Sequence, residues 1–257
     1  MQKIIKKLTV PKVILRYIMM NFTDAQTIEC LILNVKIMNV LDNYSKDILA
    51  KAKNGFQWNC KHGHLAAAKW LYSIGNVDTR NAYNEYAFRV SCIKGHLTVA
   101  KWLYSLGDVD IHADNEYAFS RSCENGHLAV AKWLYSIGVN IHAGYEYAIG
   151  LSCEHGHLAV AKWLYSIGAD IHADDEYAFT RSCMKGHLIV AQWLYSIGDI
   201  DIHVGDEYAF RWSCDYGHLT VAKWLYSLGN INIHTGDEYV FRYSKGKILD
   251  WLNTIKN

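Results

Sequence analysis

Apolar and polar positions follow a helical period over most of the chain and predict pairs of short helices. The first helix of a pair carries its small and apolar residues at i, i+1, i+4 and i+5, as in Ala118, Phe119, Ser122 and Cys123. The second helix carries them at i, i+3, i+4 and i+7, as in Val130, Trp133, Leu134 and Ile137. Each helix has about ten residues and is too short to be stable alone, so neighbouring pairs must pack together.

The helix pair is repeated along the chain with nearly constant spacing. A Gly-His dipeptide recurs at intervals of 30 to 32 residues, beginning at Gly63, Gly95, Gly126, Gly156, Gly186 and Gly217. A cysteine precedes each of these glycines by three residues, and a tryptophan follows each by seven. A period of this length predicts a solenoid in which each copy buries its apolar face against the next.

Helix boundaries are also predicted by the repeat. A Glu recurs at the start of the first helix in every copy after the first, and the polar residue directly before it is expected to act as the N-cap, except in the copy that has Tyr145 there. The expected N-caps are Asn84, Asn115, Asp175, Asp206 and Asp237. The Glu, such as Glu116, is expected in the first helical turn, where a carboxylate complements the helix dipole. Gly126 is expected to end the first helix in a left-handed conformation.

The repeat divides the chain into three parts. Residues 1–50 are expected to form a helical cap or a degenerate repeat, and their apolar run is too short to span a membrane. Residues 236–257 are expected to be a truncated capping repeat whose last helix exposes Asp250, Asn253 and Thr254. Residues 51–235 hold six repeats, at residues 51–82, 83–113, 114–143, 144–173, 174–204 and 205–235.

Helix, Gly-His turn, helix and glycine at this period resemble the ankyrin repeat. Residues 126–134 and 168–173 follow the second half of its consensus. The amino-acid sequence of the copies is similar to that of the ankyrin-repeat paralogues of giant viruses that infect amoebae. The resemblance implies an all-α fold, an α-solenoid of stacked helix-turn-helix repeats with short, blunt hairpin connections. The family's Thr-Pro-Leu-His opening is replaced by Tyr-Ala-Phe-Ser at Tyr117, which explains why Pro11 is the single proline.

Cysteine and histidine are abundant, but their spacing does not favour a metal site. No Cys-x2-Cys occurs, so the cysteines are expected to be buried, reduced thiols. The His of each Gly-His pair is expected to bridge backbone groups of the next copy. Only the pairs His62/His64 and His155/His157 are candidates for adventitious metal. No catalytic motif is present, and we expect no catalytic residue, metal or cofactor.

Variation between the copies marks the candidate binding residues. It concentrates in the two positions after each cysteine and the two after each Phe, and the resemblance implies that these line the groove that usually binds partners. Unconstrained drift of solvent-facing positions is the alternative explanation. Met184, Trp212 and Tyr216 give the set a composition typical of binding hot spots, and their replacement by Ala is expected to weaken binding without unfolding. The candidates are Arg89, Ile93, Lys94, Arg121, Glu124, Asn125, Glu154, His155, Arg181, Met184, Lys185, Arg211, Trp212, Asp215 and Tyr216.

These features predict a non-enzymatic scaffold that binds an unidentified partner protein. The net charge of +1 gives no case for nucleic acid as the main partner, and no membrane contact is expected. We expect a monomer in the cytoplasm, a host cell's if the protein is viral. The alternatives are an adaptor that recruits host proteins to a ubiquitin ligase, and a virion structural component. Six residues after Trp251 leave no room for an F-box-like segment, and residues 1–50 are too short for a BTB-type domain.

Overall fold

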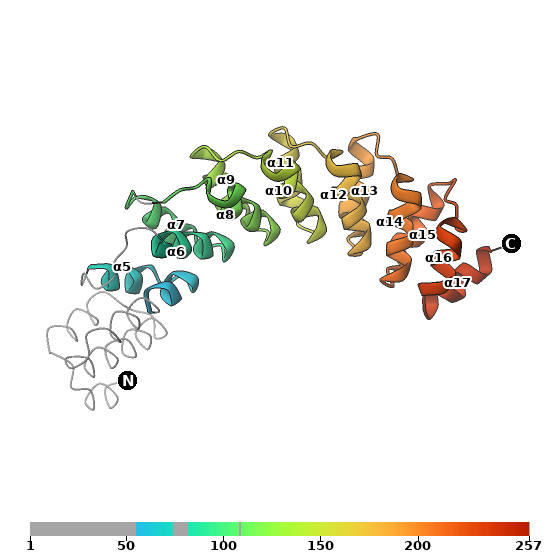
Figure 1. Cartoon of the computed structure of the whole chain (residues 1–257), viewed down its shortest axis with the longest axis horizontal. Coiled ribbons are helices and arrows are strands. Elements are labelled where there is room, and N and C mark those ends of the chain that lie inside the picture. The colour runs from blue at the N-terminus through green and yellow to red at the C-terminus, as the bar shows by residue number, and fades with distance from the viewer. Residues whose placement is uncertain (1–54, 74–81, 108, 257) are drawn as a thin grey trace, which may run out of the picture. The chain divides into compact units, whose positions relative to one another are not determined.

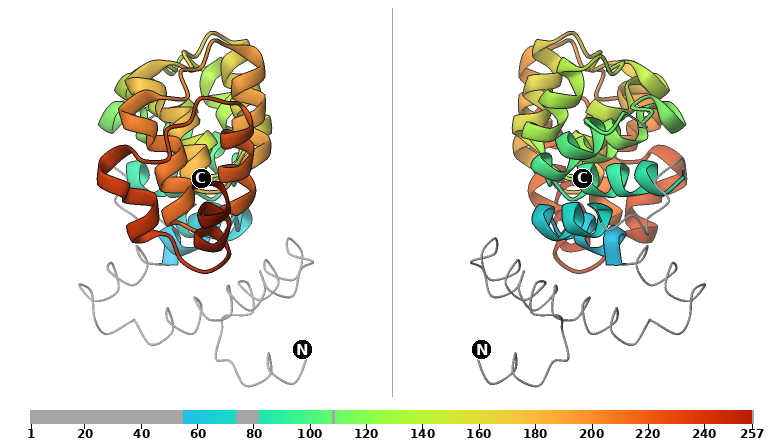
Figure 2. Two further views of the ribbon diagram at one scale, coloured as in Figure 1. Left: turned by 90° about the vertical axis from the view of Figure 1, so that its right-hand side faces the viewer. Right: turned by 90° about the vertical axis from the view of Figure 1, so that its left-hand side faces the viewer.

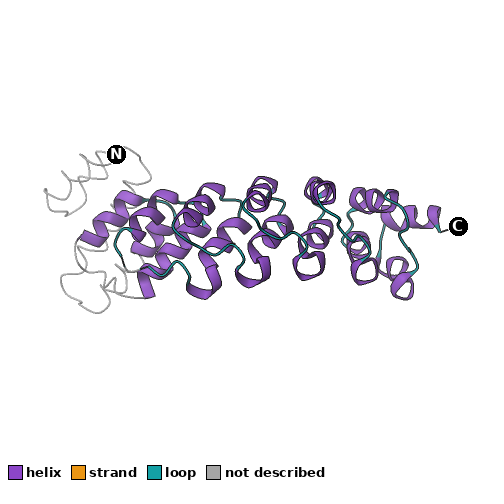
Figure 3. Ribbon diagram, turned by 90° about the horizontal axis from the view of Figure 1, so that it is seen from above, coloured by secondary structure: helices purple, strands orange, loops and turns teal. Residues whose placement is uncertain are grey.

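A computed structural model describes residues 55–73, 82–107 and 109–256. The expected cap at residues 1–50 lies outside the described residues. Every regular element within the described ranges is a helix, which confirms the prediction of an all-α fold of helix-turn-helix repeats (Figures 1 and 3). The chain divides into two compact units, Met1–Asp110 and Ile111–Asn257, which we describe separately.

The described part of the first unit contains two helix pairs. Residues 55–61 form a helix that precedes α5, and α6 packs against α7. The Ser91 hydroxyl donates to the carbonyl of Cys60 at 3.2 Å, and the ring of Phe56 meets that of Trp102 edge-on at 6.2 Å. Polar and aromatic contacts therefore join the two pairs. The labelled helices of this unit are α5 (Leu65–Ser73), α6 (Ala82–Ile93) and α7 (Leu97–Tyr104).

The second unit is a stack of helix pairs. Its helices are α8 (Ala113–Glu124), α9 (Leu128–Ser136), α10 (Ala143–Glu154), α11 (Leu158–Ser166), α12 (Ala173–Met184), α13 (Leu188–Ile197), α14 (Val204–Asp215), α15 (Leu219–Ser227), α16 (Thr235–Tyr243) and α17 (Lys247–Ile255). The even-numbered helices pack one on the next, and each is covered by the odd-numbered helix that follows it. The left panel of Figure 2 looks along this stack from α16 and α17, drawn in red.

The core of each repeat matches the predicted faces except that Trp133 and Ile137 of the second helix are half-buried. Phe119 and Cys123 are fully buried, as expected, and burial raises the pKa of the Cys123 thiol to about 12. Trp133, expected in the core, is only half-buried, and Ala131 is buried in its place. In the next copy, Trp163 is met edge-on by Phe119 and Tyr135 of the preceding repeat, so the tryptophan joins neighbouring repeats. All six cysteines of the described residues are buried and free.

The Gly-His turn locks each repeat to the one before it. Gly156 ends α10 with a φ of +77°, a left-handed conformation that favours glycine. A Cβ atom at Gly156 would lie 2.6 Å from Nδ1 of His187, the histidine of the following Gly-His pair. The His187 ring donates to the backbone carbonyl of Glu154, and its partial burial lowers its pKa. The predicted bridging role is thus confirmed, but the histidine reaches back to the preceding copy, not forward to the next.

Four of the five predicted N-caps, at Asn115, Asp175, Asp206 and Asp237, are wrong, because these residues lie in a left-handed turn, whereas Asn84 stays a prediction. Asp174, Asp175 and Glu176 have φ values of 54°, 52° and 59°, and no side chain caps α12. The right-handed part of the helix therefore begins at Tyr177. Asp, Asn and Gly tolerate this conformation better than other residues, which explains their recurrence before the Glu. The same turn occurs at residues 114–116, 205–207 and 236–238.

The Glu that ends this turn is buried and accepts hydrogen bonds from two connections between helix pairs. It does not lie on the surface as a partner of the helix dipole, contrary to the sequence-based expectation. Glu176 is only 6% exposed and accepts from Nδ1 of His172 at 2.8 Å and from the backbone N–H of Asp201 at 3.5 Å. The hydrogen bond to Glu176 raises the pKa of His172. Because His172 belongs to the preceding repeat and Asp201 to the connection after α13, one carboxylate joins two successive connections. The same His–Glu pairing occurs at His112–Glu116, His142–Glu146, His203–Glu207 and His234–Glu238.

Candidate functional site

The predicted binding residues lie on the even-numbered helices, and we call the set the first-helix stripe. Arg89, Ile93 and Lys94 lie at α6 in the first unit, where Lys94 is exposed and Arg89 and Ile93 are half-buried. The remainder belong to the second unit, at the C-terminal halves of α8, α10, α12 and α14. Their contacts divide this part of the stripe into a neutralised section and an aromatic section.

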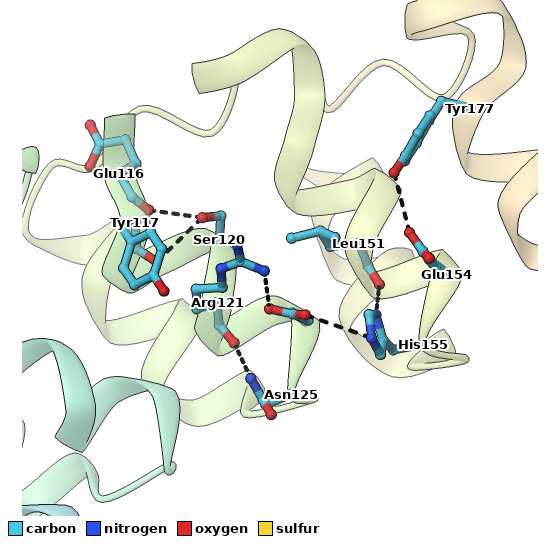
Figure 4. Close-up of polar contacts among 10 residues, drawn as sticks. Glu116, Tyr117, Ser120, Arg121, Asn125, Leu151, Glu154, His155 and Tyr177 are labelled. Carbon is cyan, nitrogen blue, oxygen red and sulfur yellow. Dashed lines mark hydrogen bonds and ion pairs between the residues drawn. The ribbon is translucent and has the colours of Figure 1, made fainter. Parts of the chain in front are cut away.

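Between α8 and α10 the stripe is neutralised by internal contacts (Figure 4). The Arg121 guanidinium donates to Glu124 at 2.7 Å and lies 5.8 Å from the ring of Tyr147 in the next repeat. The hydrogen bond to Glu124 raises the pKa of Arg121. Nε2 of His155 lies 3.6 Å from the same carboxylate, and the Asn125 amide donates to the carbonyl of Arg121 at 2.8 Å. The charged groups of these side chains are thus paired with one another before any partner arrives, although Nε of Arg121 is buried without a hydrogen-bond partner among the described residues.

Between α10 and α12 the second acidic residue of the stripe is also engaged. Glu154 accepts from the Tyr177 hydroxyl at 3.2 Å and pairs with Nζ of Lys185 at 3.5 Å. The Tyr177 ring lies on Gly150, where a Cβ would be 2.7 Å from Cδ1 of the ring. Partial burial raises the pKa of Tyr177. A glycine within α10 lowers helix propensity by about 1 kcal/mol, and the close approach of Tyr177 explains why it is there.

Met184 does not lie on the surface, contrary to the sequence-based expectation. It is only 4% exposed, and its sulfur accepts from the Arg181 guanidinium at 3.5 Å. Arg181 also lies 4.9 Å from the ring of Tyr177. Arg181 and Tyr177, but not Met184, also line a hollow of about 230 Å³. Its lining residues are Asp174, Asp175, Tyr177, Thr180, Arg181, Val204, Gly205 and Tyr208. We therefore remove Met184 from the candidate contact residues.

Aromatic side chains of α14 and α16 gather at the C-terminal end of the stripe. We call Tyr208, Trp212, Tyr216, Tyr239 and Tyr243 the aromatic cluster. The Trp212 ring lies 5.5 Å from those of Tyr208 and Tyr216 and 6.2 Å from that of Tyr239. Tyr239 lies 4.5 Å from Tyr243. Tyr216 is 52% exposed and Tyr243 is 51% exposed, so the cluster presents aromatic surface to solvent.

Two charged residues, Asp215 and Arg211, contact Tyr239 of the aromatic cluster. The Tyr239 hydroxyl donates to Asp215 at 3.3 Å, and burial is the main cause of its raised pKa. The Arg211 guanidinium lies 5.2 Å from the Tyr239 ring and donates to the carbonyl of Gly205 at 2.8 Å. Sequence reasoning found Trp212 and Tyr216 but missed the other three members. Tyr243 could have been found, because it occupies the position of Trp212 in the last copy.

Within the described ranges, the two histidine pairs considered as candidates for metal binding do not form part of a larger group of metal-binding side chains. His62 and His64 stack with ring centroids 6.3 Å apart, and the Trp58 ring stacks on His62 at 4.1 Å. No group of three or more His, Cys, Asp or Glu side chains in the described part of the chain could hold a metal ion. No helix among the described residues is long and apolar enough to cross a membrane.

Comparison with known proteins gives one match. A family model described as ankyrin repeats, in three copies, matches residues 56–145. No curated protein matches the chain. The matched segment includes α5 to α9, and the later helix pairs repeat its Gly-His turn and its Tyr-on-Trp contacts. The predicted ankyrin-type repeat is thereby confirmed, whereas the likeness to viral paralogues stays a prediction.

Proposed function

Residues 56–145 are ankyrin repeats, which are generally protein–protein interaction modules, and from this premise we propose that the chain binds a partner protein through the first-helix stripe. The aromatic cluster is the proposed anchor. Ankyrin repeat proteins are typically non-enzymatic scaffolds, and we propose the same role here. The free, buried cysteines of the described residues favour a reducing compartment such as the cytoplasm.

One observation carries the choice of anchor. Tyr216 and Tyr243 combine large rings with solvent exposure and Trp212 lies half-buried beside Tyr216, whereas the charged residues of α8 and α10 are paired with one another. Trp, Tyr and Arg dominate binding hot spots because large rigid surfaces are desolvated at little cost in side-chain entropy. The stripe section on α14 and α16 is therefore best suited to anchor a partner.

A competing surface lies on the second helices. Ile189 of α13 is 70% exposed, and a hollow of about 520 Å³ beside it is lined by Gly156, Leu158, Gly186, His187, Leu188, Ile189 and Val190. The other copies have Ala or Thr at the position of Ile189. This patch offers one aliphatic side chain without neighbouring aromatic anchors, so we use it as the matched control.

The test is affinity capture with the full chain and two variants, read by quantitative mass spectrometry. Proteins retained by the wild type and by Ile189→Ala, but lost with Trp212→Ala/Tyr216→Ala, are the expected result. Loss of at least about 2 kcal/mol of binding energy, roughly thirtyfold in affinity, is typical of a hot-spot pair. Retention by the double variant, with loss in Ile189→Ala, would place the binding face on the second helices and refute the proposal.

Two narrower roles compete within this proposal, and both use the same binding face. An adaptor for a ubiquitin ligase would capture ligase subunits together with a second protein that is ubiquitinated. A virion structural component would be abundant in purified particles. The same capture experiment, together with the protein content of purified particles, separates the two roles.

A further inference from the structure

The turn between α16 and α17 has a lysine, Lys247, where the inner turns have the histidine of the Gly-His pair. Inner copies have a Gly-His pair at this point, whereas the last copy has Lys245, Gly246 and Lys247. Both lysines are exposed, as is Arg242 on the last turn of α16. None of the three is ion-paired with a carboxylate of the described residues. Three exposed cationic groups therefore lie within four residues of Tyr243 in the chain, at the C-terminal end of the aromatic cluster.

The acidic residues of the stripe cannot neutralise these cations. Glu124 is paired with Arg121, Glu154 with Lys185, and Asp215 accepts from Tyr239. Each carboxylate is thus already engaged within the stripe. Arg242, Lys245 and Lys247 outnumber the two carboxylates of the adjoining helix ends, Asp215 at the end of α14 and Asp250 in the first turn of α17, so the charge left at the C-terminal end of the stripe is positive.

The free acids of α14 and α16 lie at the opposite ends of the helices. Asp206 and Asp237 belong to the left-handed turns that open the two helices. Tyr208 and Tyr216 are eight residues apart on α14, which corresponds to about 12 Å along the helix. This separation exceeds the Debye length of about 8 Å at physiological salt, so the basic end presents its own field to a partner.

We infer that the C-terminal ends of α14 and α16 bind an acidic peptide segment of the partner that carries one apolar or aromatic anchor. The inference rests on the proposed function and specifies the partner's chemistry. The anchor packs on Trp212, Tyr216 and Tyr243, and the flanking carboxylates pair with Lys245 and Lys247. Cations at the rim of an aromatic site speed association with an acidic partner and exclude basic ones.

A protein segment fits this surface better than a nucleic acid. The chain carries a net charge of only +1, and an extended phosphate backbone that ran along α14 would reach Asp206 at the helix start. A short peptide needs only the aromatic surface and the adjacent cations. Binding of single-stranded RNA at this site is therefore an outcome that would overturn the inference.

The probe is a library of random short peptides selected on the immobilised full chain. Enriched peptides are expected to combine Asp or Glu with one Trp, Phe or Leu. In fluorescence polarisation, Lys245→Glu/Lys247→Glu and replacement of the peptide's Glu by Gln should each weaken binding at least about tenfold. Lys132→Glu/Lys162→Glu changes the net charge equally on the exposed side of α9 and α11, and should leave affinity unchanged. Added NaCl should weaken binding of the acidic peptide.

The variants separate failure of the inference from failure of the proposed function. Peptides that lose affinity for Trp212→Ala/Tyr216→Ala but not for the lysine variant would overturn the acidic partner and keep the binding face. Peptides that bind both variants like the wild type would overturn both. No enrichment, enrichment without acidic residues, or equal competition by single-stranded RNA would each overturn the inference.

Discussion

Replacing Gly156 with alanine adds a methyl group where the ring of His187 already lies. The new Cβ would be 2.6 Å from Nδ1 of that ring, closer than any ordinary contact, and it would hold a φ of +77°. A left-handed conformation costs an alanine about 1–2 kcal/mol, and overpacking adds about 1–3 kcal/mol. We therefore expect Gly156→Ala to lower the free energy of unfolding by about 2–5 kcal/mol.

Gly217 provides the matched control for this substitution. It occupies the same position in a later Gly-His turn with a φ of +86°, but no heavy atom of the described residues lies within 4 Å of a Cβ built there. The reason is that the last copy replaces the Gly-His pair by Lys245–Gly246–Lys247. Gly217→Ala should therefore cost only the conformational term of about 1–2 kcal/mol.

Equilibrium urea unfolding of four proteins measures the steric term by itself. These are the wild type, Gly156→Ala, His187→Ala and the double variant, followed by circular dichroism. In the His187→Ala background, the cost of Gly156→Ala should fall to that of Gly217→Ala, which gives a coupling energy of about 1–3 kcal/mol. Additive effects of the two substitutions would show that the histidine ring does not make the glycine necessary.

Three further predictions concern the buried core and two kinds of histidine, the one that pairs with the buried Glu (His172) and the one in the Gly-His turn (His187). Met184→Ala should lower the free energy of unfolding by about 2–5 kcal/mol in urea titrations and leave partner affinity unchanged where the variant is folded; weaker binding by folded protein would return Met184 to the contact surface. His172 has a raised pKa in the folded chain, so its contribution is complete below its unfolded pKa of about 6.5 and is lost as pH rises through the folded value. His187 has a lowered pKa, so its contribution to the free energy of unfolding is complete above about pH 6.5 and is lost as pH falls. His172→Gln should therefore destabilise the chain most at acidic pH, and His187→Gln most at alkaline pH. Parallel pH profiles for the two variants would contradict both assignments. The cysteines of the described residues should resist iodoacetamide at pH 8 until urea unfolds the chain, since burial raises the pKa of Cys123 and Cys153 to about 12; peptide-level mass spectrometry would detect native labelling, which would contradict their burial.

Much of the fold could be predicted because one pattern is copied many times. The spacing of Phe119 and Cys123 defines a buried helix face, and the recurrence of Gly126 marks where that helix ends. The solenoid architecture then follows from the period of the repeat. Core positions are the easiest to predict because burial depends mainly on apolar character and helical spacing.

The errors arose where side chains act across repeats. Asn115 and Asp175 looked like N-caps, since a cap and a left-handed turn favour the same small polar residues. The buried role of Glu176 depends on a backbone N–H that lies 25 residues further along the chain, in the connection after α13, a partner that no local pattern reveals. Met184 is buried although it occupies a position where the other copies have exposed or half-buried residues, all of them polar except Ile93. Neighbouring helices, which sequence spacing does not place, determined these outcomes.

The central proposal concerns where a partner binds, and a hydrogen–deuterium exchange footprint tests it most directly. The full chain would be compared with and without the protein that wild-type capture retains. Protection should concentrate in peptides that contain Trp212, Tyr216 and Tyr243, at the C-terminal ends of α14 and α16. Protection confined to the second helices, above all around Ile189 of α13, would contradict the assignment of the first-helix stripe as the binding face.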